Sequence, residues 1–358
     1  MDREKWRNTS RTRISVHLFL LLRGLSKTAN IRYTEDIFAK SNHMSWGNHM
    51  IGFIVNPASG NGNGRKVWKK AEDVLKAEQR PCIARWTEKP GDAKAFAREM
   101  ALRHDCDAII AVGGDGTLGE AAAGLLEAGA RVPLGHLPAG SGNDFARAMG
   151  IPPNDVKTLA KWLDAGALQP LDALLIETPG RAGGVAVCSV GAGFDGKVAQ
   201  VTNRAAYKKW LNRFRLGAFA YFLSVLRVLL TYRPGRVRLT VDGRTFEYEN
   251  VWLVTVTNIP YFGGGMRICP EAQPGDGLAD VCVVHRVNRL EFVRAFPKVY
   301  AGRHVSHPGV SFHRGREVHI RSETALAAHA DGEFAGETPL EVRVAAGALR
   351  VLGGAPGS

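Results

Sequence analysis

The sequence contains few cysteines and none of the motifs through which cysteine or histidine commonly forms a zinc site. Its five cysteines include no CxxC pair, which favours reduced, buried thiols in a reducing compartment. HExxH and GxSxG are absent from the 358 residues. Zinc-protease and serine-hydrolase chemistry of those types therefore has no support.

Acidic residues are absent from one long stretch. Between Gly196 and Val241 there is no Asp or Glu, whereas ten residues are Lys or Arg. The whole chain has a formal charge of +13, and residues 1–49 contribute nine Lys or Arg against four Asp or Glu. A local basic surface indicates an anionic partner such as a membrane, nucleic acid or phosphate-rich ligand, with a solvated face beside a core helix as the alternative.

Apolar runs long enough to span a bilayer are also absent. Residues 14–25 and 216–230 are apolar but shorter than the roughly 20 residues that a spanning helix needs. Residues 203–231 have apolar side chains at helical spacing, with basic residues interleaved, which argues against nucleic acid as the partner. We expect 204–236 to dock on an anionic membrane, mainly through Lys208, Lys209, Arg213 and Arg215, or else to form a core helix.

Residues 1–49 differ in pattern from the rest of the chain and are expected to be an N-terminal extension. They could lie on a surface, or they could precede the true start, because Met44 and Met50 stand just before the first clear strand. No small-residue cleavage site comes after the apolar segment, which argues against a signal peptide. We expect a cytoplasmic protein, peripherally associated with the inner face of the membrane.

From residue 50 to about 170 the pattern is that of an α/β domain. Strands are predicted at 50–57, 82–88, 107–114 and 133–140, and helices at 64–79, 91–104, 117–129 and 144–150. Such alternation predicts a parallel sheet covered on both faces.

From 171 to 337 the pattern changes to short strands joined by turns. It predicts a mostly antiparallel β-sandwich domain, interrupted by the helical stretch at 203–231. Residues 337–353 read as two further strands.

Three loops rich in Gly, Ser and Asn come directly after strands of the first domain. They are "NPASGNGNG" (56–64), "GGDGT" (113–117) and "LPAGSGND" (137–144). Ligands bind at the carboxyl ends of parallel strands, where glycine-rich backbone and a helix N-terminus attract phosphate. Thr117 can donate to a phosphate oxygen, and Asp115 is suited to hold Mg²⁺. The loops match neither a Walker A motif nor the GxGxxG fingerprint.

In this order, the three loops resemble the diacylglycerol kinase catalytic-domain family. "SVGAGFDG" (189–196), "YFGGGMRICPEAQPGDGLADV" (261–281) and "DGEF" (331–334) extend the resemblance over about residues 50–350. It implies a lipid kinase with an NAD-kinase-like nucleotide domain plus a β-sandwich. The chain end, about residues 338–358, would return to the first domain. The later motifs argue against an NAD kinase.

The resemblance also implies roles for individual residues. Asp115 would act on phosphate through Mg²⁺-bound water, Glu333 would be the general base with Asp331 beside it, and Asp144 and Asp172 would belong to the Asp115 network. A structural Mg²⁺ would be held by Gln273, Asp276 and Leu278. The positions that would bind ATP are Asn56, Thr87, Gly113, Gly114, Asp115, Gly116, Thr117, Leu118, Gly119, Ser141, Asn143 and Asp144.

The implied reaction is transfer of the γ-phosphate of ATP to a hydroxyl of a membrane lipid. Diacylglycerol is the first candidate, and a sphingoid or ceramide acceptor and a non-catalytic lipid-binding member are the alternatives. The family usually has Asn where this chain has Gly119, which puts some nucleotide contacts in doubt. The sequence leaves open whether the protein forms a homodimer.

Overall fold

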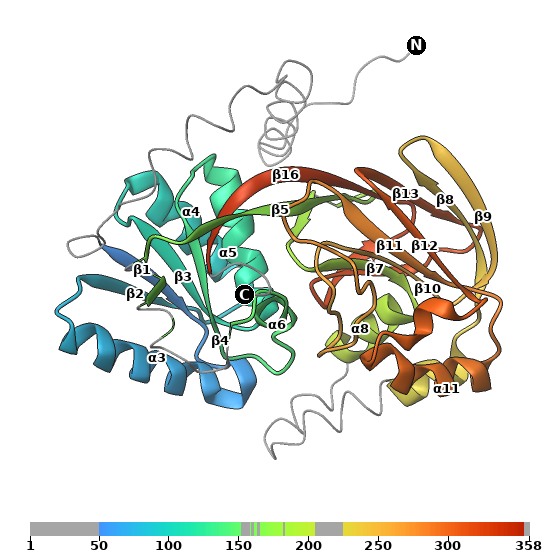
Figure 1. Ribbon diagram of the computed structural model, residues 1–358, viewed down its shortest axis with the longest axis horizontal. Helices are drawn as coiled ribbons and strands as arrows, with labels where there is room; N and C mark the ends of the chain where they lie inside the picture. Colours follow the sequence, from blue (N-terminus) through green and yellow to red (C-terminus); the bar gives the residue numbers. More distant parts are fainter. Residues whose placement is uncertain are drawn as a thin grey trace, which may run out of the picture.

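The computed structural model describes residues 50–151, 158, 161–162, 165–181, 183–204 and 225–353. These residues form two halves joined by two long strands (Figure 1). Residues 1–49 and most of the expected basic helix, including its four named cations, lie outside the described residues. No helix in the described ranges is both long and apolar enough to cross a membrane.

The first half alternates strands with helices, as predicted. Its elements are β1 (Ile51–Val55), α3 (Ser59–Ala77), β2 (Cys82–Trp86), α4 (Asp92–Arg103), β3 (Ala108–Gly113), α5 (Asp115–Ala128), β4 (Leu134–Pro138) and α6 (Asp144–Ala148). The four strands are parallel, in the order β2-β1-β3-β4. The predicted parallel α/β sheet is therefore confirmed.

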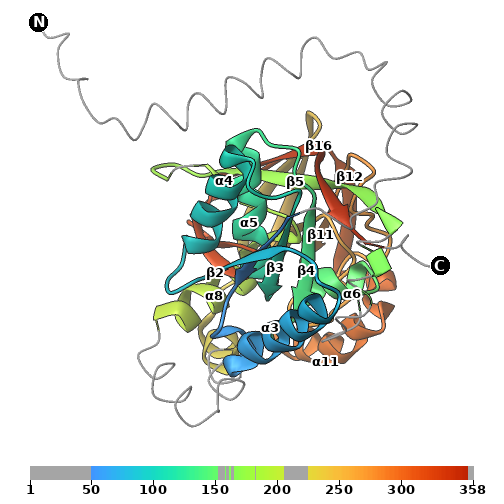
Figure 2. The same ribbon diagram turned by 90° about the vertical axis from the view of Figure 1, so that its left-hand side faces the viewer.

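Both faces of this sheet are covered because neighbouring strand residues point to opposite sides. Phe53 and Ile110 pack with Trp68 of α3, whereas Ile54 and Ile109 belong to the buried cluster that α4 and α5 complete. Figure 2 shows α3 and the α4–α5 pair on opposite sides of the strands.

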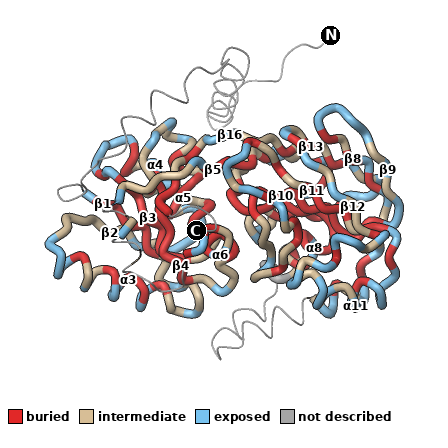
Figure 3. The backbone as a smooth tube through the Cα atoms, in the orientation of Figure 1, coloured by how far each residue is buried: buried red, intermediate tan, exposed pale blue. Residues whose placement is uncertain are grey.

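The second half is built mainly from antiparallel strands, again as predicted. Its elements are β5 (Leu168–Glu177), β6 (Gly184–Ala186), β7 (Ser189–Gly193), α8 (Phe194–Arg204), β8 (Gly235–Val241), β9 (Arg244–Val251), β10 (Leu253–Thr257), β11 (Ala279–Val284), α11 (Arg289–Tyr300), the 3₁₀ helix η2 (Arg303–Ser306), β12 (Val310–Gly315), β13 (Glu317–Ser322), β14 (Ala327–Ala330), β15 (Glu333–Glu337) and β16 (Leu340–Leu352). One sheet has the order β12-β11-β10-β7-β14-β15. It packs against β8, β13 and β16 through a buried aliphatic core (Figure 3).

Strand β16 connects the halves. It pairs antiparallel with β13 and β5, and near its end Val351 pairs in parallel with Leu134 of β4. The large sheet therefore runs continuously from β2 to β9. Because one strand belongs to both halves, loops from the two halves are held at a fixed junction.

Helix α11 was not predicted from the sequence, although it carries a clear start signal. Asn288 accepts from the amide of Glu291, and the Glu291 carboxylate accepts from the amide of Asn288. This reciprocal capping box fixes the first turn of the helix. Residues 225–231 are also helical and are the described end of the predicted basic helix.

Candidate active site

The three glycine-rich loops meet at the carboxyl edge of the parallel sheet, as expected. Their backbones pass so closely that side chains would separate them. A Cβ atom on Gly140 would lie 2.6 Å from the Cα atom of Gly114, and one on Gly60 would lie 2.1 Å from the carbonyl oxygen of Ala139. Glycine is therefore required here by close approach of the loops.

Several residues implied to bind ATP surround this junction. The Asn56 amide donates to the Thr117 hydroxyl at 3.1 Å, which links the first loop to the start of α5. Asn143 exchanges two hydrogen bonds with the backbone of Gly140 and adopts a left-handed φ of 51°. Ser141 lies in the same loop, and Thr87 directly follows β2.

Asp115 joins two of the loops. Its carboxylate oxygens accept from the amides of Asp144, at 3.0 Å, and Phe145, at 3.1 Å. It thus satisfies the free amides at the start of α6 while lying in the first turn of α5. Each oxygen retains a further lone pair, so Asp115 can still accept from water or a ligand.

Asp144 connects this arrangement to the second half. Its carboxylate accepts from the Gly264 amide at 2.8 Å and from the Arg147 guanidinium at 2.8 Å. Burial raises the pKa of Asp144, partly opposed by these donors. Arg147, which we did not single out from the sequence, also lies over the Tyr261 ring, 5.6 Å from its centroid. Its position about one helical turn after Asp144 is the feature of the sequence that could have identified Arg147 as the partner of that carboxylate.

A cavity of about 410 Å³ opens beside α6. Its lining consists of Ser141, Gly142, Asn143, Ala146, Arg147, Gly150 and Ile151. The last loop of the predicted phosphate cradle is therefore next to open space large enough for part of a ligand.

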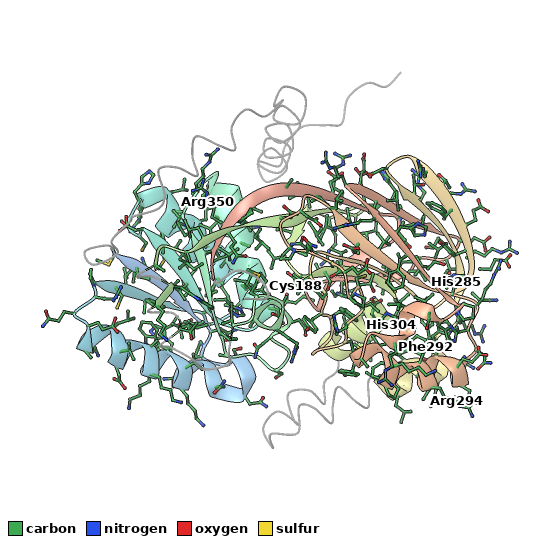
Figure 4. All side chains as sticks on the ribbon, in the orientation of Figure 1. Cys188, His285, Phe292, Arg294, His304 and Arg350 are labelled. Atoms are coloured by element: carbon green, nitrogen blue, oxygen red, sulfur yellow. The ribbon has the colours of Figure 1, made fainter. Side chains whose placement is uncertain are left out.

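The "DGE" turn reaches α5 from the second half. Asp331 adopts a left-handed φ of 45°, and its carboxylate accepts from the amides of Val187, Cys188 and Ser189, each at 2.9 Å. Figure 4 shows Cys188 at the junction of the two halves. Burial, reinforced by the charge of Asp115, raises the pKa of Asp331 to about 6 against the effect of the three amides.

Glu333 begins β15 and is exposed. A Cβ atom on Gly116 would lie 3.6 Å from Glu333 Oε1, so this carboxylate lies next to the first turn of α5. The structure thus gathers Asp115, Asp331 and Glu333 around one helix N-terminus, where the backbone amides favour negative groups.

Asp172 lies elsewhere and does not join the Asp115 network. It is fully buried on β5, and its carboxylate accepts from the amides of Gly277 and Gly347, each at 2.7 Å. The expectation that it accompanies Asp144 is wrong, because these bonds commit it to the loop around residues 273–278 and to β16.

That loop was expected to hold a structural Mg²⁺ through Gln273, Asp276 and Leu278. In the structure one Asp276 oxygen accepts from the Leu278 amide at 2.9 Å, and the other pairs with Arg314. Asp280 also faces Arg314, at 3.6 Å. The guanidinium thus lies between the two carboxylates, where it would compete with a divalent ion for Asp276, and the Mg²⁺ site stays a prediction.

A second buried acidic group lies behind the DGE turn. Asp195 accepts from Thr255 and from His329 Nε2, each at 3.2 Å. The other ring nitrogen, Nδ1, accepts from the Gly332 amide at 3.4 Å. No feature local to either residue in the sequence indicates this pairing, because the two are 134 positions apart.

Comparison with known proteins agrees with this geometry. Residues 50–176 match the diacylglycerol kinase catalytic domain, and residues 188–353 match the YegS C-terminal NAD kinase beta sandwich-like domain. A diacylglycerol kinase from Bacillus subtilis is 32% identical over 293 residues, 80% of this chain and 91% of the relative. The chain belongs to the diacylglycerol kinase catalytic-domain family. It is a lipid kinase, and membership of a kinase family implies ATP as co-substrate.

Other members extend the likeness. A diacylglycerol kinase from Mycobacterium tuberculosis is 32% identical over 310 residues, 85% of this chain and 96% of the relative. The structure of a diacylglycerol kinase from Bacillus anthracis superposes with a TM-score of 0.63 at 22% identity, covering 87% of this chain and 99% of that one. The latter likeness shows the fold alone.

Proposed function

We propose that this lipid kinase transfers the γ-phosphate of ATP to a hydroxyl group of a membrane lipid, with diacylglycerol as the acceptor. The observation that carries the proposal is the convergence at the start of α5. Glycine loops suited to phosphate lie there together with Asp115, while Asp331 and Glu333 arrive from the other half. The names of the relatives support diacylglycerol over other lipid alcohols.

Glu333 is the proposed general base. Its carboxylate is exposed beside Gly116, so an acceptor hydroxyl can approach it near the γ-phosphate. It would take the hydroxyl proton as that oxygen attacks phosphorus in line. Phosphoryl transfer has a loose transition state, so positioning and charge stabilisation contribute more than strong basicity.

The loop amides and the start of α5 would hold the phosphates, and Thr117 would donate to one of their oxygens. Mg²⁺ bound with ATP would neutralise phosphate charge. Asp115 fits a role toward water around that ion, because each of its oxygens has one amide donor and one remaining lone pair. Among the described residues the one group of three potential metal ligands, Glu317, His319 and Glu341, lies on β13 and β16, away from these loops.

The proposal is tested by incubating purified protein with γ-labelled ATP, Mg²⁺ and a total bacterial lipid extract, and identifying the labelled product by mass analysis. We expect labelled phosphatidic acid. Label in a sphingoid or ceramide phosphate would move the acceptor to another lipid class, and no labelled lipid would refute the proposed reaction.

A further inference from the structure

The strand that begins with Glu333 lies at an edge of its sheet. Among the described strands β15 is the last in the order β12-β11-β10-β7-β14-β15, and it pairs with β14. The pairing is irregular: Phe334 lies opposite His329, whereas Gly336 lies opposite the residue that precedes His329, so Ala335 is an extra residue. Such a bulge bends a strand and redirects its side chains. Contacts from outside the sheet are therefore needed to fix the start of β15.

The connection between β5 and β6 packs against this edge. Residues 178–181, with the sequence Thr-Pro-Gly-Arg, form a turn in which the Arg181 amide donates to the Thr178 carbonyl at 3.4 Å. Gly180 has a φ of 73°, and a proline followed by a left-handed glycine is typical of a type II turn. Thr178 and Arg181 are thus the two ends of one tight turn.

The side chains of both residues donate to backbone carbonyls of β15. The Arg181 guanidinium donates to the Phe334 carbonyl at 3.1 Å and lies over the Phe334 ring, 5.2 Å from its centroid. The Thr178 hydroxyl donates to the carbonyl of Ala335, the bulged residue, at 3.4 Å. A Cβ atom on Gly336 would lie 3.0 Å from Thr178 Oγ1 and 3.2 Å from Arg181 Cδ. The turn therefore fits closely against the bulge.

Arg181 is suited to this double contact. A planar guanidinium can donate to a carbonyl and stack on a ring at the same time, whereas a lysine ammonium offers a single charged centre. Both contacts are made to Phe334, the residue that directly follows Glu333. On the other side of Glu333, the Asp331 carboxylate is held by three backbone amides. The backbone of Glu333 is thus anchored from both directions.

We propose that Arg181 is a positioning residue for Glu333. By holding Phe334 it keeps the Glu333 carboxylate beside Gly116, in the first turn of α5. The inference rests on the proposed role of Glu333 as general base. A general base must lie within hydrogen-bond reach of the hydroxyl from which it takes a proton, and a small misplacement of reacting groups slows the reaction strongly.

The test combines kinetics with hydrogen exchange. Arg181→Gln removes the guanidinium, whereas Arg181→Lys keeps the charge and a possible donor to the carbonyl. Arg289→Gln is the matched control, because the Arg289 guanidinium also donates to a backbone carbonyl, that of Tyr232, at 3.0 Å. Each protein is assayed with Mg²⁺, ATP and a detergent-dispersed short-chain diacylglycerol, so that access to a vesicle surface does not affect the rate.

We expect kcat to fall roughly 10- to 100-fold in Arg181→Gln and less in Arg181→Lys, with KM for ATP and the melting temperature close to wild type. Backbone amides of residues 333–337 should exchange faster in Arg181→Gln, because the strand opens locally more often. In a Glu333→Gln background, Arg181→Gln should reduce kcat little further, since two residues that act as a unit are not additive. Arg289→Gln should keep the wild-type kcat and the wild-type exchange at 333–337.

Wild-type kcat and exchange in Arg181→Gln would overturn the inference. So would a full additional loss of kcat in the Glu333→Gln background together with a higher KM for ATP, because Arg181 would then bind the nucleotide directly. If the wild type phosphorylates no lipid but exchange at 333–337 becomes faster in Arg181→Gln, the proposed function fails, whereas the anchoring of the strand by Arg181 stands.

Discussion

Gly119 and Asp331 come together across the junction of the two halves: a Cβ atom on Gly119 would lie 2.7 Å from Asp331 Oδ2. Real Cβ contacts essentially never come this close. The Asp331 carboxylate has little freedom to retreat, since it accepts from three consecutive amides. This chain has Gly119 where the family usually has Asn, and at this position α5 packs closely against the DGE turn.

Restoring the family residue should therefore harm this enzyme. We expect Gly119→Asn to reduce kcat at least tenfold and to lower the melting temperature, because the new Cβ displaces Asp331 and the turn that carries Glu333. Gly129→Asn, at the C-cap that follows the same helix, is the matched control, with open space around the Cβ position and a φ of 61° that Asn tolerates. Wild-type kinetics and stability for Gly119→Asn would disprove this account of the close approach.

Activity should decrease as the pH falls through about 6. Burial raises the pKa of Asp331 from 3.8 to about 6, so the folded protein binds a proton at this site more tightly than the unfolded chain does. The contribution of Asp331 to stability is therefore greatest below about pH 4 and is lost as the pH rises through 6.

Activity, unlike stability, should be lost when Asp331 is protonated. A protonated carboxyl group is a weaker acceptor for the three amides than the carboxylate is. The measurement is the pH profile of kcat, with circular dichroism at each pH to show that the protein remains folded. Asp331→Asn should be less active and should lack this limb. An unchanged acid limb in that variant would assign the titration to another group.

His329 should act as a positioning residue for Glu333. Its Nε2 faces Asp195, which leaves Nδ1 free to accept from the Gly332 amide. His329→Asn keeps an oxygen near the Nδ1 position, whereas His329→Gln places its amide near Nε2 and leaves the Gly332 amide without an acceptor.

We expect kcat to fall about tenfold for His329→Gln and much less for His329→Asn, with KM for ATP unchanged in both. The difference in kcat between the two variants identifies the role of His329. If that role were only structural, the loss of kcat in each variant would follow its decrease in melting temperature instead. Equal losses of kcat in the two variants, parallel to their stability, would contradict positioning through Nδ1.

Arg314 should make the loop around Asp276 independent of divalent ions. The guanidinium lies between the Asp276 and Asp280 carboxylates, so wild-type melting should not change on addition of EDTA. Arg314→Gln should melt lower and regain stability with millimolar Mg²⁺, and Arg321→Gln, at an exposed position on β13, is the control. A lower wild-type melting temperature in EDTA would restore the structural Mg²⁺ held by Gln273, Asp276 and Leu278.

Much of the fold could be predicted because its local signals agree with its tertiary structure. Apolar runs followed by glycine-rich loops located the parallel strands, and the GGDGT, SGND and DGE motifs located the residues that converge. Contacts between residues distant in sequence could not be predicted in the same way. The resemblance grouped Asp172 with Asp144, but nothing local to Asp172 shows that the amides of Gly277 and Gly347 lie beside it.

Two further features were missed for different reasons. Helix α11 carries a capping box at Asn288 and Glu291 that sequence inspection could have found. The pairing of His329 with Asp195 joins residues 134 positions apart, and a single histidine in an apolar strand has no local feature that reveals its partner.

The most direct measurement of the central claim is the kinetics of Glu333→Gln. The substitution keeps the size of the side chain and removes its capacity to accept a proton. We expect kcat for lipid phosphorylation to fall roughly 10²–10⁴-fold, the usual contribution of a general base, while the dissociation constant for ATP and the melting temperature stay close to wild type. A variant that retains kcat but binds ATP weakly would contradict the account, because Glu333 would then be a nucleotide-binding residue.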